Sequence, residues 1–95
     1  MLADTLETYE EISVPQTNAA RCVAKDTVGR PALVGILVSA PTENTKDVIV
    51  GDDATSPTRG AIVAPGRTVL LPLRDASALF SVSAAAGQKL RIVKF

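Results

Sequence analysis

Short apolar blocks separated by turn-forming residues run through almost the whole sequence. Valine, isoleucine and leucine gather in these blocks, and Gly, Pro, Asn, Asp, Ser and Thr stand between them, a pattern typical of a β-sandwich or barrel. Parallel pairing would require crossover helices, which the chain lacks. We therefore predict an all-β fold, an antiparallel two-sheet β-sandwich of which the jelly roll is one form. The expected strands are Glu11–Val14, Ala20–Lys25, Leu33–Ser39, Asp47–Val50, Gly60–Val63, Thr68–Leu73, Phe80–Ser83 and Lys89–Phe95.

The first residues do not follow this pattern. Leu2, Leu6 and Tyr9 have helical spacing, but a helix from Leu2 to Glu10 is too short to be stable alone in water. An extended or partner-ordered arm is the preferred alternative. The sequence thus predicts an N-terminal arm or extension over residues 1–18 and a β-sandwich domain over residues 19–95.

Local signals predict several turns and one helical turn. Ala64-Pro65-Gly66 has the residues of a type II turn. Gly51-Asp52-Asp53 is expected to end a strand with left-handed or Asx-turn geometry. A single helical turn is predicted at Asp75–Leu79, with Asp75 as its cap. In the last strand, Leu90 and Ile92 alternate with Lys89, Arg91 and Val93, which predicts one side facing the core and the other facing solvent or a partner.

Groups that usually carry out catalysis are scarce. The sequence has no histidine and a single cysteine, Cys22, so it lacks the base of a thiol triad, the ligands of a usual zinc site and an intrachain disulfide. Cys22 is expected to be a buried core residue. Asp52 and Asp53 could bind calcium with Asn44 or Asp47, but the ligand spacing of calcium loops is missing. We expect a turn there, and no enzymatic activity, cofactor or metal.

Charge and size point towards association with other proteins. Ten basic and ten acidic residues cancel, so nucleic acid is not an expected partner. The longest apolar run, Leu33–Val38, is far shorter than the roughly 20 residues of a membrane span, and residues 1–11 lack the pattern of a signal peptide. A lone thiol fits a reducing cytoplasm. Because so small a domain often needs further stabilisation, we expect it to form oligomers or to dock on a partner.

Five residues are candidates for a partner interface. Tyr9 and Phe95 are two of the three aromatic residues, and aromatic side chains contribute strongly to interface energy. Arg59 lies in the polar segment 52–59 and could pair with a carboxylate of a neighbour, the alternative being a solvated loop charge. Leu2 and Leu6 lie in the expected arm.

The second half of the chain resembles small virion proteins of tailed bacteriophages. The resemblance rests on Val48–Asp53 (VIVGDD), Thr58–Leu73 (TRGAIVAPGRTVLLPL) and Asp75–Ile92 (DASALFSVSAAAGQKLRI), about half the chain. It implies a β-sandwich scaffold, self-association and docking on a shell. Within that group the chain is most like a capsid decoration (cement) protein, which implies a homo-oligomer, with a trimer favoured, bound to the major capsid protein on the virion surface after synthesis in the host cytoplasm.

Two alternatives to a decoration protein remain open. The first is a structural module of a phage tail or fibre, which would have the same fold but few copies per particle. The second is a small cellular ligand-binding or adaptor domain, which predicts a monomer with a concave pocket. The first half of the chain, including the expected arm, does not take part in the resemblance.

Overall fold

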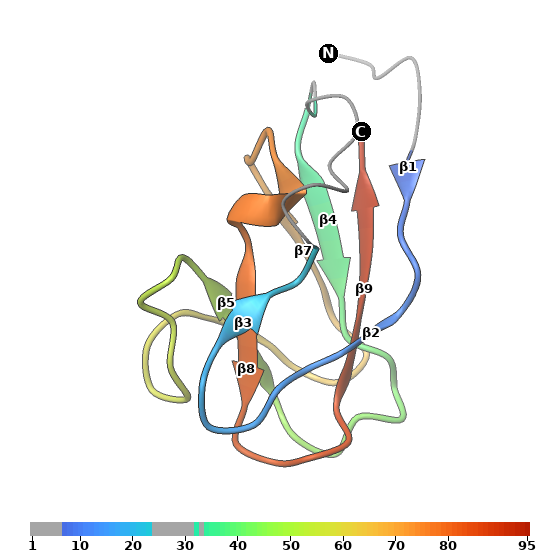
Figure 1. Ribbon diagram of the computed structural model, residues 1–95. Coiled ribbons are helices and arrows are strands. Elements are labelled where there is room, and N and C mark those ends of the chain that lie inside the picture. Colours follow the sequence, from blue (N-terminus) through green and yellow to red (C-terminus); the bar gives the residue numbers. More distant parts are fainter. Residues whose placement is uncertain (1–6, 24–31, 33) are drawn as a thin grey trace.

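The chain folds into two antiparallel β-sheets packed face to face (Figure 1). A computed structural model describes residues 7–23, 32 and 34–95. The prediction of an all-β, two-sheet sandwich is confirmed. Within these ranges no helix is long and apolar enough to cross a membrane. The elements are β1 (Glu7–Thr8), β2 (Ile12–Ser13), β3 (Ala20–Arg21), β4 (Ile36–Ser39), β5 (Val48–Gly51), β6 (Ala61–Val63), β7 (Thr68–Leu71), the 3-10 helix η2 (Ala76–Ala78), β8 (Phe80–Ser83) and β9 (Lys89–Lys94).

The strand order is that of a jelly roll. One sheet runs β1-β9-β4-β7, with β2 also paired to β9, and the other runs β3-β8-β5-β6. Strands of the first half pair with strands of the second half in nested order: β2 with β9, β3 with β8, β4 with β7 and β5 with β6. The β4–β9 ladder joins the pairs β2/β9 and β4/β7 in one sheet, and the β5–β8 ladder joins β3/β8 and β5/β6 in the other. Nested pairing of this kind defines the double-sheet jelly roll.

The N-terminal strands run along the edge of β9 with a bulge between them. Thr8 pairs with Val93 and Ile12 with Leu90, so residues 9–11 face residues 91–92, one extra residue on the edge strand. A β-bulge bends a strand and increases its twist. Two segments of the predicted arm, Glu7–Thr8 and Ile12–Ser13, are therefore strands paired with β9, and Glu7–Thr8 is strand where the helical alternative would have placed helix.

The core lies between the two sheets. Ile36, Val38, Leu90 and Ile92 are fully buried in one sheet and pack with Val48, Val50 and Val63 of the other. The predicted inward side of the last strand is confirmed. The same inward set continues to Lys94, which is only 3% exposed and whose ammonium group lies 5.8 Å from the centroid of the Tyr9 ring.

Two of the predicted turns follow the expected chemistry. Gly66 has φ of +79°, and the Arg67 amide donates to the Ala64 carbonyl at 2.9 Å, as a type II turn requires. Asp75 caps η2, because its carboxylate accepts hydrogen bonds from the Ser77 amide and hydroxyl at 2.9 and 2.8 Å.

The turn after β5 is only partly as predicted. Asp52 Oδ1 accepts from the Ala54 amide at 2.9 Å, which is the expected Asx geometry. Gly51 is not left-handed. Glycine fits there for another reason, since a Cβ atom would lie 2.6 Å from Oγ1 of Thr55 and the Thr55 side chain would have to move.

Candidate functional site

Cys22 is a core residue without a reactive environment. It is 8% exposed, and burial raises the pKa of its thiol to about 11, with an opposing contribution from the Ser81 hydroxyl. A nucleophilic cysteine requires a lowered pKa and access. Its predicted place in the core is confirmed. Val23 beside it is buried as well, whereas Ala20 is exposed.

The aspartates after β5 lie in a turn. Asp52 is engaged with the Ala54 amide, and Asp53 is exposed beside it. Asn44, one of the two co-ligands considered, bonds to Lys89. Over the described ranges no three carboxylate, thiol or imidazole side chains come close enough together to hold a metal ion.

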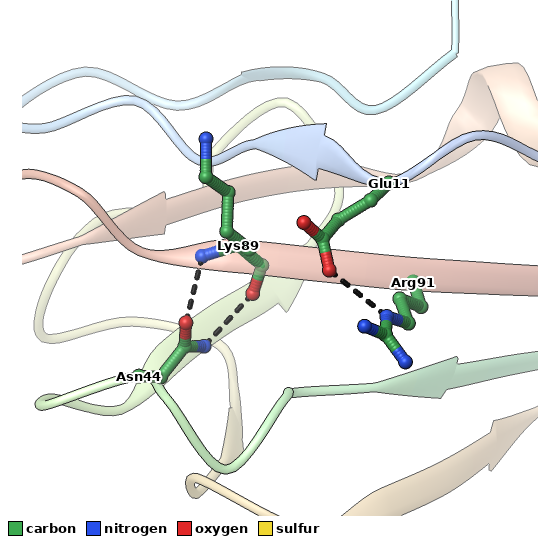
Figure 2. A network of polar contacts seen from close by, with 4 residues as sticks. All are labelled: Glu11, Asn44, Lys89 and Arg91. Atoms are coloured by element: carbon green, nitrogen blue, oxygen red, sulfur yellow. Dashed lines mark hydrogen bonds and ion pairs between the residues drawn. The ribbon is translucent and has the colours of Figure 1, made fainter.

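A buried amide clamp ties the loop after β4 to the start of β9. Beyond the end of the β4–β9 ladder, the Asn44 side chain bonds to the backbone of β9. Its Nδ2 donates to the Lys89 carbonyl and its Oδ1 accepts from the Lys89 amide, both at 2.8 Å (Figure 2). Next to it, Gln88 Oε1 accepts from the amides of Thr45 and Lys46 at 2.8 and 3.0 Å. Both side chains are at least nine-tenths buried, so the clamp is a structural part of the fold.

An exposed ion pair crosses the bulge on the other edge of β9. Arg91 Nε lies 2.9 Å from Glu11 Oε2 (Figure 2). The two side chains are 61% and 37% exposed, so solvent screens the attraction. This pair aligns the N-terminal edge with β9 but contributes little to stability.

Apolar side chains gather on the outer side of the β1-β9-β4-β7 sheet. Leu37 pairs with Leu70 on one side and with Val93 on the other, and these three point outward because their neighbours Ile36, Val38 and Ile92 are fully buried. Phe95 continues the same alternation, with its backbone bonded to Gly35. We call Leu37, Leu70, Val93 and Phe95 the outer apolar face.

This face is open to solvent. Leu70 is 52% exposed, and Leu37, Val93 and Phe95 are half-buried. The remaining outward positions of the sheet are polar, such as Thr8, Ser39 and Thr68. Contiguous apolar surface with a polar rim is a common mark of a protein–protein contact.

A cleft opens at one end of the sandwich between the two sheets. It has a volume of about 560 Å³ and lies between the start of β6 and the end of β7, within the usual size range of ligand sites. Val50, Leu71, Leu73 and Leu79 form apolar walls, and Arg59 supplies a cation. Asp52 and Thr55 lie in the same lining.

The predicted interface residues do not come together in one place. Phe95 belongs to the outer apolar face, and Arg59 is exposed at the cleft. Tyr9 packs against the core of its own chain. Leu2 and Leu6 lie outside the described residues.

Sequence reasoning placed Val93 on the non-core side of the last strand but missed Leu37 and Leu70 as surface residues. Each lies in an apolar block, and the blocks alone do not say which members face outward. The pairing register, which brings residues 37, 70 and 93 into one row, was the missing information.

Comparison of the chain with models of protein families, with curated proteins and with solved structures found no match. The assignment of a function therefore depends on the residues and the geometry described above.

Proposed function

We propose that this chain is a structural subunit that docks on a larger assembly through its outer apolar face. The observation that carries the proposal is the row formed by Leu70, Leu37 and Val93, extended by Phe95. These side chains lie on a sheet whose backbone is fixed by ladders on both sides of β4 and β9. A rigid, partly apolar sheet face can bind with little ordering cost.

Within this class we propose a capsid decoration (cement) subunit of a tailed bacteriophage, bound to the major capsid protein as a homo-oligomer, with a trimer favoured. The support is the sequence resemblance in residues 48–92 together with a compact sandwich that offers a docking face. The action would be passive: each copy adds buried area across neighbouring shell subunits. An oligomer makes such weak contacts collectively strong.

Particle composition tests the decoration role. In particles of the virus that encodes this chain, quantitative mass spectrometry should find a copy number comparable to that of the main shell protein. A few copies per particle would point to the tail or fibre module instead. Absence of the chain from purified particles would refute the virion role.

A double variant tests the docking face. Leu37→Thr with Val93→Thr keeps side chains that suit strands but removes apolar contact area. Binding to particles that lack the chain should weaken at least about tenfold, equivalent to about 1.4 kcal/mol. Ile62→Thr, at a 62% exposed position on the other sheet, is the matched control and should bind like the unchanged chain.

The cleft favours a second candidate, a small ligand-binding or adaptor domain. Its volume of about 560 Å³ and its apolar walls with one arginine suit a small apolar molecule bearing a polar group. This candidate predicts a monomer at all concentrations and a rise in melting temperature with such a ligand. A stable oligomer that binds particles, with no thermal shift, would exclude it.

A further inference from the structure

The two sides of the sandwich differ in how their edge strands are protected. On one side, the edge strands are β1 and β2 in one sheet and β3 in the other. These strands and the bulge between β1 and β2 contain the charged residues Glu7, Glu11 and Arg21. At the other side, β6 and β7 read Ala-Ile-Val and Thr-Val-Leu-Leu and contain no charged residue. Natural sheets usually guard a free edge with charge, proline or a bulge. The β6/β7 side therefore lacks the usual protection along its strands.

The β7 edge has backbone groups available for another strand. The Ala40 amide donates to the Arg67 carbonyl at 3.0 Å, and β4 and β7 continue in the same register from there. Bonded and non-bonded pairs alternate in an antiparallel ladder, so Thr68 and Leu70 direct their N–H and C=O groups away from β4. Within the described residues, no strand pairs with β7 on that side.

Arginines stand at both ends of this edge. Arg67 directly precedes β7 and is exposed, and Arg59 lines the cleft next to Leu71, where β7 ends. In the described part of the chain, neither arginine forms an ion pair. Asp52 also lines the cleft, which leaves these three groups with a net positive charge. The edge thus favours an apolar segment with acidic residues beside it.

We infer that the β7 edge binds an extended segment of a partner protein as an added strand, with alternating apolar side chains and acidic residues at its ends. The cleft between Ala61 and Leu71 takes an apolar side chain of that segment. Pro72 has no amide hydrogen and ends the ladder, so the bound segment is about four to six residues long. Main-chain bonds supply affinity and the two arginines supply selectivity. This inference goes beyond the proposed function, because it adds the β7 edge as a second contact surface next to the outer apolar face and does not depend on the virion role.

Selection from a peptide library tests the inference directly. A displayed library of random peptides of about ten residues, the upper end of usual strand length, is selected on the folded chain. Enriched peptides should alternate apolar residues and carry Asp or Glu at the ends. Leu70→Lys should weaken their binding at least about tenfold, and Arg67→Ala or Arg59→Ala should weaken it less and reduce its salt dependence.

A matched lysine on the opposite edge provides the control. Thr8→Lys places the same charge at an exposed outward position of β1, and peptide affinity should not change. Circular dichroism and thermal melting should show that all variants are folded.

Four results would overturn the inference: no enrichment, enrichment of peptides without acidic residues, binding insensitive to Leu70→Lys, or a dimer mass in light scattering that Leu70→Lys reduces to a monomer mass. Failure of the selection would leave the particle count, which tests the proposed function, unaffected. Conversely, absence from particles would remove the virion role but leave a peptide-binding edge.

Discussion

Cys22 illustrates how one buried group makes stability depend on pH. Burial raises its thiol pKa from the ordinary 9.0 to about 11. The unfolded chain therefore loses the thiol proton at lower pH than the folded chain does, and the free energy of unfolding contributed by this group falls as pH rises from about 9 to about 11.

We predict that Cys22→Ala abolishes this part of the pH dependence. Urea unfolding of both chains at several pH values between 8 and 11 measures the difference in stability, from which the contribution of every group common to both chains cancels. The native thiol should also react with a disulfide reagent only as fast as the protein opens. Fast labelling of the folded chain at pH 8 would contradict the assignment.

Tyr9 carries a hydroxyl group that is buried without a hydrogen-bond partner in the described part of the chain. An unsatisfied buried polar atom costs free energy. Tyr9→Phe removes that atom and keeps the ring against the core, so we expect unchanged or higher stability, by up to about 1 kcal/mol, in chemical denaturation. A loss of more than about 1 kcal/mol would show that the hydroxyl is satisfied in solution.

Asp75 links the start of η2 to acid stability. Hydrogen bonds from the Ser77 hydroxyl and amide lower the pKa of this carboxyl below its ordinary value. Its contribution is present above the ordinary pKa and is lost as pH falls through the lowered one. Asp75→Ala should cost about 1 kcal/mol at neutral pH and less in acid, whereas Asp75→Ser, another capping residue, should restore most of the loss. An equal cost of Asp75→Ala at both pH values would argue against the cap.

At the scale of elements, the two polar contacts on either side of β9 should differ strongly in their contribution. Asn44→Ala leaves the Lys89 amide and carbonyl without their partners, and we expect a loss of about 1–3 kcal/mol. Arg91→Ala breaks an exposed pair and should cost less than about 1 kcal/mol. Chemical denaturation of both variants tests the contrast, and equal losses would contradict a buried structural role for Asn44.

Strand positions were largely predictable, because turn chemistry and valine-rich blocks mark them locally. The blocks expected at Phe80–Ser83 and Lys89–Phe95 became β8 and β9 with almost the same bounds. β1 was missed because Glu7 and Thr8 give no apolar signal, and its pairing with Val93 and Lys94 depends on a contact distant in sequence.

The candidate site was less predictable than the strands. Phe95 and Arg59 could be chosen from residue type, but the outer apolar face depends on the register between β4, β7 and β9. No local pattern in the sequence sets that register. Similarly, Lys94 follows the inward alternation of β9 although its charge suggests solvent, since pairing with Ile36 fixes its direction.

For the whole molecule, the proposed self-association makes apparent stability depend on protein concentration. If folding and oligomer formation are coupled, mass action raises the melting temperature as the chain is concentrated. We expect this rise together with a trimer mass in light scattering. The Leu37→Thr, Val93→Thr variant should show neither if the same face joins the copies, and both if that face serves only the shell. A constant melting temperature and a monomer mass would exclude self-association.

The nested pairing of strands has a consequence for how the chain is made. β9 lies at the centre of its sheet, where it pairs with β1, β2 and β4. During synthesis on the ribosome, that sheet cannot form before residues 89–94 have emerged. Until then, the apolar side chains of the earlier strands stay exposed to solvent. Such long-range topologies fold slowly, in about milliseconds to seconds. Chaperone demand should therefore be highest just before the last strand appears.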